Sequence, residues 1–124
     1  MDSSETVKKF ISCYNEFDLD GMLELLTDDI VFENIIGGNT DVRTTGIAEF
    51  ENLAGTSLNL FEERKQTVIK MTLDGSSVNV EIDFYGKIAE DLPNGLKKGD
   101  ELKLKGRSVY KMKDGKICSL TDIS

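Results

Sequence analysis

The sequence predicts an α+β fold, because its helical and strand patterns occupy different parts of the chain. Apolar residues recur at steps of three and four over most of the first 58 residues. From residue 63 onward they alternate with polar residues, as they do in half-buried strands. Two Asp-Gly pairs divide this second part in the way that hairpin turns do. We therefore expect an antiparallel sheet with helices packed on its concave face, and a cavity where the helices do not fill it.

The first two helices are predicted from apolar stripes that follow acidic capping residues. Asp2 and Glu5 have the spacing of a capping box at the start of a helix over residues 3–17. Asp18 can cap a second helix. The apolar stripes are formed by Val7, Phe10, Ile11, Tyr14 and Phe17 in the first helix, and by Leu19, Met22, Leu23 and Leu26 in the second.

A strand, a loop and a third helix are predicted next. The pair Asp28-Asp29 is expected to end the second helix, and residues 30–36 are rich in the β-branched and aromatic side chains that strands favour. Residues 37–41 are expected to form a loop. Gly46 opens the third helix, whose apolar side consists of Ile47, Phe50, Leu53, Ala54 and Leu58.

Four further strands are predicted from residue 63 to the end, with turns at Asp74-Gly75 and Asp114-Gly115 and a polar loop over residues 90–99. Strict alternation assigns one face of the first pair of strands to Thr67, Ile69, Met71 and Leu73, and to Val78, Val80, Ile82 and Phe84. In the last pair, over residues 100–112 and 116–123, the same rule groups Ser108 with Tyr110, and Cys118 with Leu120 and Asp122.

The opposite face of the sheet is expected to be charged. Glu81 and Asp83 lie on one strand, and Lys103, Lys105 and Arg107 lie on the next. This pattern is typical of a cross-strand ladder of opposite charges on an outer face, although an ionic catalytic site is the alternative. Val68, Tyr85 and Val109 add apolar area to this face, so we predict a homodimer that forms through the sheet.

The composition indicates one globular domain over residues 1–124. The net charge of −8, from 15 basic and 23 acidic residues, argues against nucleic acid or an anionic membrane as a partner. The N-terminus is acidic and lacks the apolar core of a signal peptide, so a cytoplasmic location is expected. The chain has no histidine and only two cysteines, which removes Ser-His-Asp and Cys-His catalysis and any zinc cluster from consideration. Cys13 and Cys118 are interpreted as small core or surface residues and not as nucleophiles.

Four segments resemble the nuclear transport factor 2-like superfamily, and within it the SnoaL-like polyketide cyclases and ketosteroid isomerase-like proteins. The segments are DLDGML at 18–23, LTDDIVFE at 26–33, TGIAEF at 45–50 and KDGKI at 113–117. The resemblance implies a cone-shaped curved antiparallel sheet wrapped on three N-terminal helices, with a deep pocket at the open end. Many members of this superfamily are homodimers.

The resemblance also suggests which residues to examine for catalysis. Ketosteroid isomerases carry a general-base aspartate after a glutamate on the first strand, where this chain has Asn34, and an acidic residue at the place near Ser108. Their first-helix tyrosine aligns near Phe10, with Tyr14 one turn later. SnoaL-like cyclases use a pocket aspartate as an acid–base residue, and Asp122 is the carboxylate here that is best placed for this role.

Each of these candidates also has a purely structural interpretation. Tyr14 could be an ordinary core tyrosine, Asn34 could be satisfied by protein groups, and Asp122 could be a solvated carboxylate near the C-terminus.

The sequence therefore predicts a cofactor-free domain that binds a small, mostly apolar molecule and that could catalyse a proton-transfer isomerisation or cyclisation. The alternative is a non-catalytic ligand-binding or dimerisation module. The predicted catalytic residues are Asp122 and Tyr14. The predicted ligand-binding residues are Phe10, Tyr14, Phe32, Asn34, Phe50, Leu53, Phe84, Ser108, Tyr110 and Leu120.

Overall fold

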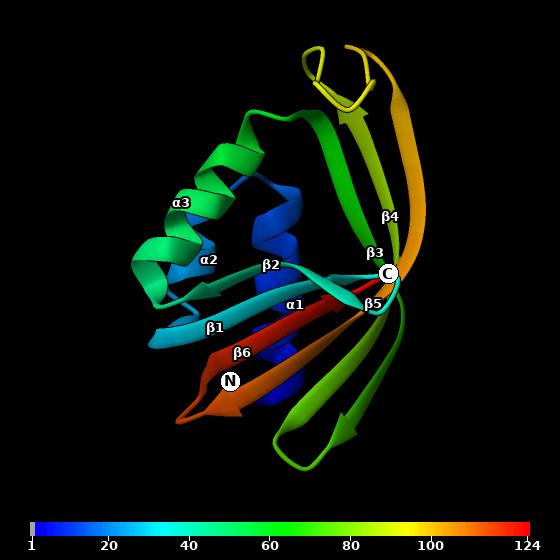
Figure 1. Ribbon diagram of the computed structural model, residues 1–124. Helices are drawn as coiled ribbons and strands as arrows, with labels where there is room; N and C mark the ends of the chain where they lie inside the picture. The colour runs from blue at the N-terminus through cyan, green and yellow to red at the C-terminus, as the bar shows by residue number, and fades with distance from the viewer. Residues whose placement is uncertain (1) are drawn as a thin grey trace.

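The computed structural model describes residues 2–124, and its helices and strands follow one another in the order ααββαββββ. The sheet curves around the helices without closing into a barrel, so the predicted α+β fold is confirmed (Figure 1). The helices are α1 (Ser3–Asn15), α2 (Leu19–Leu23) and α3 (Ile47–Leu58). The strands are β1 (Leu26–Ile36), β2 (Asn39–Thr45), β3 (Phe61–Asp74), β4 (Ser77–Ile88), β5 (Glu101–Lys113) and β6 (Lys116–Ile123).

The strands lie in the order β2-β1-β6-β5-β4-β3. The predicted meander from β3 to β6 is antiparallel throughout, as expected. β1 joins this meander by pairing with β6 in parallel, which makes the sheet mixed. Figure 1 shows β3, β4 and β5 as long, bent strands that give the sheet its curvature. The first and last strands of the chain therefore lie side by side inside the sheet.

Short polar contacts hold the first two helices in the predicted places. The carboxylate of Asp2 accepts a hydrogen bond from the Glu5 amide at 2.9 Å, and that of Asp18 accepts one from the Gly21 amide at 3.0 Å. Gly21 also permits close packing, since a Cβ there would collide with the Asp18 carboxylate and lie 2.8 Å from the sulfur of Cys13. The end of α1 and the start of α2 are therefore packed together at a glycine.

The predicted end of the second helix is wrong. α2 ends at Leu23, and the acidic pair Asp28-Asp29 lies inside β1. Leu26, which also fits the helical stripe, pairs with Ile117 of β6 and is only 2% exposed. Burial of this leucine in the sheet outweighs the local helical pattern.

β2 was not predicted, because a loop was expected over residues 37–41. Only Gly37 and Gly38 form the turn, and Asn39 already pairs with Ile36 of β1. β2 is an edge strand with polar side chains, and Thr44 is its one buried residue. β2 is held in the sheet by its main-chain hydrogen bonds to β1 and not by buried side chains. Its sequence therefore shows no alternation of apolar residues from which a strand could be predicted.

Both predicted hairpins form, but one of the two turns lies one residue later than predicted. Asp114 and Gly115 are the two turn residues between β5 and β6, and both have positive φ. Between β3 and β4 the turn consists of Gly75 and Ser76, because Asp74 still pairs with Ser77. That turn therefore begins one residue later than the Asp-Gly pair suggests.

A bulge in β3 overturns the predicted assignment of its faces. The register shifts between Val68 and Lys70, so Ile69 is an extra residue. Arg64 pairs with Gly86 and Gln66 with Phe84 of β4. Side chains of directly paired residues share a face. The concave face of β3 consequently carries Arg64, Gln66, Val68, Met71 and Leu73, and Thr67 and Ile69 leave it. Val68 also leaves the predicted dimer face.

A second irregularity affects β6. The register shifts between Ile117, which pairs with Met112, and Ser119, which pairs with Lys111, so Cys118 lies at a bulge. Ile117 is fully buried while Cys118 is only half-buried. The concave face of β6 therefore carries Ile117 in place of the predicted Cys118, together with Leu120 and Asp122. Cys13 is buried in the core, as interpreted from the sequence.

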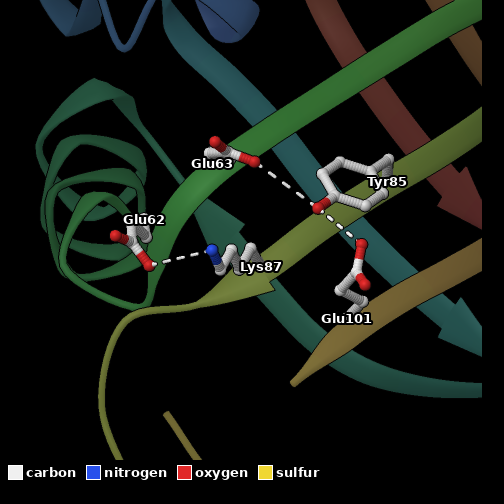
Figure 2. A network of polar contacts seen from close by, with 5 residues as sticks. All are labelled: Glu62, Glu63, Tyr85, Lys87 and Glu101. Carbon is white, nitrogen blue, oxygen red and sulfur yellow. Dashed lines mark hydrogen bonds and ion pairs between the residues drawn. The ribbon is translucent and has the colours of Figure 1, made fainter. Parts of the chain in front are cut away.

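The convex face of the sheet carries the predicted charge ladder. In the register of β4 and β5, Glu81 is opposite Arg107 and Asp83 is opposite Lys105, with an ion pair of 3.2 Å in the second case. The Tyr85 hydroxyl donates to the carboxylate of Glu101 at 2.8 Å and lies 3.4 Å from that of Glu63, as the dashed lines in Figure 2 mark. The hydrogen bond to Glu101 raises the pKa of Tyr85 to about 12.

A further ion pair joins Lys87 and Glu62 at 3.8 Å in the same region (Figure 2). These exposed pairs contribute little to stability, in keeping with a solvated face. Among residues 2–124, no helix is long and apolar enough to cross a lipid bilayer.

Candidate functional site

A cavity of about 90 Å³ lies between the three helices and the concave face of the sheet. Most of its lining is apolar, which suits a small organic ligand. The polar side chains on its wall come from α1, α3, β3, β5 and β6 and are Tyr14, Ser57, Arg64, Gln66, Tyr110 and Asp122. The apolar lining consists of Phe10, Leu19, Met22, Phe32, Phe50, Leu53, Ala54, Leu58 and Leu120.

Aromatic rings form one side of this cavity. The rings of Phe10 and Tyr110 meet edge to face with their centroids 5.9 Å apart, and those of Phe32 and Phe50 do so at 5.7 Å. Phe10 and Phe50 are also neighbours, at 6.5 Å. Such edge contacts between rings stabilise the core and hold each ring in one orientation. The cavity therefore has a rigid aromatic wall that joins α1, α3, β1 and β5.

Asp122 is the acidic side chain on the cavity wall. The Ser108 hydroxyl donates a hydrogen bond of 2.6 Å to its Oδ1 from the neighbouring strand. Loss of water around the carboxylate raises the pKa of Asp122 to about 6, although the Ser108 hydrogen bond opposes this by favouring the charged form. Asp122 does not pair with Lys116 or any other cation within the described residues. Such a carboxyl can both accept and return a proton near neutral pH.

Asn34, Asp122 and Ser108 form a row across three neighbouring strands. In the sheet register, Asp122 is opposite Asn34 of β1 on one side and Ser108 of β5 on the other. All three border a second, more open hollow of about 110 Å³ near the end of β6, and Asp122 borders the main cavity as well. The polar groups that the sequence suggested thus come together, with Asp122 between two hollows.

Tyr14 and Arg64 meet on the helix side of the cavity. The guanidinium carbon of Arg64 lies 3.7 Å from the centre of the Tyr14 ring and 4.6 Å from that of Phe17. Its Nε donates a hydrogen bond of 3.0 Å to the main-chain oxygen of Tyr14. Arg64 is only 6% exposed. Burial raises the pKa of the Tyr14 phenol and lowers that of the Arg64 guanidinium, which an arginine tolerates without losing its proton at neutral pH.

Two hydrogen bonds between Asn15 and Gln66 fix the part of β3 that carries Arg64. The Asn15 side chain donates to the Gln66 main-chain oxygen at 3.0 Å and accepts from the Gln66 amide at 2.7 Å. This pair of hydrogen bonds joins the end of α1 to β3, two residues from Arg64. The cation is therefore part of a fixed wall.

The fold also occurs in known proteins. The SnoaL-like domain family matches residues 7–120. This chain belongs to the SnoaL-like domain family. No curated protein matches its sequence significantly.

Solved structures share the fold of this SnoaL-like domain at low sequence identity. A candidate polyketide cyclase from Xanthomonas campestris is 22% identical, with a TM-score of 0.82 over 98% of this chain and 88% of that one. An LEH-like epoxide hydrolase from M. tuberculosis is 20% identical, with a TM-score of 0.77 over 96% and 79%. A Catenulispora acidiphila protein with a ketosteroid isomerase-like fold, in complex with trimethylamine, is 15% identical, with a TM-score of 0.78 over 98% and 85%.

The predicted site residues divide between the two hollows of the SnoaL-like domain. Asn34, Phe84 and Ser108 do not line the main cavity and border the second, more open hollow. The ring of Phe84 packs edge to face against Phe61 at 5.6 Å. The predicted residues on the wall of the main cavity are Phe10, Tyr14, Phe32, Phe50, Leu53, Tyr110, Leu120 and Asp122.

Arg64 is the charged cavity residue that was not predicted from the sequence. The other lining residues outside the predicted set are Leu19, Met22, Ala54, Ser57, Leu58 and Gln66. Arg64 lies in the charged run of residues 62–65, which reads as a solvated strand face. Strict alternation along this strand also assigns Arg64 to the face opposite that of Met71 and Leu73. Only the bulge turns it inward. Within residues 2–124, no cluster of three or more side chains could hold a metal ion.

Proposed function

We propose that this SnoaL-like domain binds a small, mostly apolar molecule in its main cavity and that Asp122 transfers a proton on that molecule. The observation that carries the proposal is a carboxyl on an apolar cavity wall with a pKa raised to about 6. A general base or acid is most effective when its pKa lies near the working pH. The polyketide cyclase neighbour with the same fold adds support for chemistry of this kind.

In the proposed reaction, the ionised Asp122 removes a proton from a carbon next to a ligand carbonyl. The electron pair moves onto the carbonyl oxygen to form an enolate, to which the Tyr14 hydroxyl donates a hydrogen bond. In an isomerisation, the protonated Asp122 returns its proton to another carbon of the conjugated system. In a cyclisation, the enolate carbon attacks a second carbonyl of the same molecule, and Asp122 protonates the alkoxide that forms.

A β,γ-unsaturated cyclic ketone such as 3-cyclohexenone is a suitable first probe for this proton transfer. Its conversion to the conjugated isomer is followed by ultraviolet absorbance. We expect the wild-type domain to accelerate the conversion and Asp122→Asn to lose at least about a hundredfold, the usual contribution of acid–base catalysis. Asp41→Asn, which changes an exposed carboxylate of β2, is the matched control and should keep the wild-type rate. Full turnover by Asp122→Asn contradicts the catalytic role.

The second candidate function is a non-catalytic ligand-binding or dimerisation module. Two observations favour it. The general-base position of the ketosteroid isomerases holds Asn34, an amide that takes up no proton at neutral pH. The cavity of about 90 Å³ is also smaller than the roughly 300–1,000 Å³ of sites for drug-sized ligands. A wild-type domain that binds small ketones without converting them would support this candidate over the enzyme.

The cytoplasmic location and the homodimer expected from the sequence belong to the same proposal. Val109 and the ring of Tyr85 on the convex face support the homodimer. The test of the homodimer is given with the predictions below.

A further inference from the structure

Arg64 contributes the positive charge on the wall of the main cavity. The other cavity residues able to carry a charge are Tyr14 from α1, Tyr110 from β5 and Asp122 from β6, and each of these is either neutral or negative. When Asp122 is protonated, the cavity therefore has a net positive charge. This sign is opposite to that of the whole chain, whose net charge is −8.

The charge of Arg64 is not neutralised by the protein. In the part of the chain that the structure describes, Arg64 forms no ion pair with a carboxylate. Its contacts are the faces of two aromatic rings, one main-chain oxygen and the hydroxyl of Tyr14. A buried charge normally has an ionic partner, because removal of its water is costly. The aromatic rings and the carbonyl offset only part of that cost.

A purely structural role, in contacts with the Tyr14 carbonyl and hydroxyl, accounts for only part of the donors of Arg64. Its Nε–H satisfies the Tyr14 carbonyl in the last turn of α1, which is a common use of a basic side chain at a helix end. The other four N–H groups have no carboxylate or main-chain carbonyl as a partner among residues 2–124. The two terminal nitrogens of a guanidinium form a fork that matches the two oxygens of a carboxylate.

We propose that Arg64 anchors a carboxylate on the ligand, so that the main cavity takes a small aromatic or alicyclic carboxylic acid in its ionised form. This inference rests on the proposed ligand-binding function and names its substrate class. The apolar body of such a ligand packs against the aromatic wall formed by Phe10, Phe32 and Phe50. Asp122 lines the same cavity, where its proton transfer takes place.

Benzoate and its neutral analogue benzamide form a matched pair of probes. Dissociation constants are measured by NMR titration of the whole chain at about pH 5, where benzoate is ionised and Asp122 is protonated. We expect benzoate to bind the wild type at least about tenfold more tightly than benzamide, because a charge-assisted hydrogen bond replaces a neutral one.

Variants test whether this preference depends on Arg64. Arg64→Met should bind benzoate at least about tenfold more weakly and benzamide about as well as the wild type does. Arg64→Lys keeps the charge but not the fork, so it should recover part of the preference. Lys65→Met removes the neighbouring exposed cation and controls for net charge. It should bind both probes as the wild type does.

A titration of Asp122 in the wild type tests the same inference without a variant, and so it remains valid if Arg64→Met does not fold. An anion bound beside Asp122 disfavours a second negative charge, so saturating benzoate should raise the pKa of Asp122 and benzamide should leave it unchanged. By linkage, benzoate binding should weaken as the pH rises through about 6.

The outcomes separate this inference from the proposed function. Equal binding of benzoate and benzamide, or unchanged benzoate binding by a folded Arg64→Met, would overturn the role of Arg64 and leave ligand binding intact. If neither probe binds the wild type, both the inference and the proposed ligand-binding function are overturned.

Discussion

The Ser108 hydroxyl donates a hydrogen bond of 2.6 Å to Oδ1 of Asp122 across the antiparallel pair β5–β6. This bond favours the charged carboxylate, whereas the surrounding protein favours the neutral acid and determines the direction of the shift. The two effects together leave the pKa of Asp122 at about 6. A single hydroxyl on the next strand thus tunes the carboxyl that we propose as the catalytic group.

Ser108→Ala should raise the pKa of Asp122 above its wild-type value. The variant removes the hydrogen bond that stabilises the charged form and leaves the carboxylate as dehydrated as before. A carbon-13 NMR titration of the Asp122 carboxyl measures the change directly. The rising limb of any pH–rate profile should move to higher pH with it. An unchanged or lower pKa would show that the hydroxyl does not favour the ionised form.

Asp122→Asn should make the domain more stable at neutral pH. The folded pKa of about 6 lies above the ordinary value of 3.8, so the folded state binds more protons than the unfolded state between these two values. The cost of ionising Asp122 in the folded protein therefore grows as the pH rises from about 4 to about 6. A shift of roughly two units corresponds to about 3 kcal/mol at most.

Urea unfolding of the wild type and Asp122→Asn at pH values on either side of this window measures the effect. The stability difference in favour of the variant should be larger above pH 6 than below pH 4. Asp41→Asn, at an exposed site, should show no such pH dependence. The linkage argument fails if the wild type is the more stable protein at pH 7.

Gly21→Ala and Gly55→Ala should have opposite effects on stability. A methyl group at Gly21 would meet the Asp18 carboxylate and the sulfur of Cys13, so we expect a loss of about 1–3 kcal/mol. A methyl group at Gly55 in α3 would meet only Leu19 Cδ2 at 3.9 Å, an ordinary contact. The higher helix propensity of alanine should then add about 0.5–1 kcal/mol. Thermal or urea unfolding of the pair provides the comparison, and equal effects at the two sites would contradict it.

The homodimer stays a prediction, and its most direct test is sedimentation equilibrium. We expect the wild type to be a dimer at micromolar concentration. Val109→Lys should weaken that dimer, because it places a charge at an apolar side chain of the convex face. A wild type that sediments as a monomer at these concentrations would remove the prediction.

The local patterns of the sequence determined the helices, the hairpins and the direction in which Asp122 points. The capping residues Asp2 and Asp18 and the apolar stripes that follow them predicted α1 and the start of α2. Asp114-Gly115 set the last hairpin, and alternation from there put Leu120 and Asp122 on the concave face. These features depend on residues close together in the chain, so a short window contains the physical cause.

Tertiary structure alone decided the parallel pairing of β1 with β6, the edge strand β2 and the inward position of Arg64. Each depends on main-chain hydrogen bonds between segments far apart in the chain, which impose little on side-chain type. The bulge at Ile69 is the clearest case, because one extra residue exchanges the two faces of β3 beyond it. Alternation along the sequence cannot reveal this extra residue, because the bulge arises from the pairing of β3 with β4. The inward position of Arg64 is therefore visible only in the paired strands.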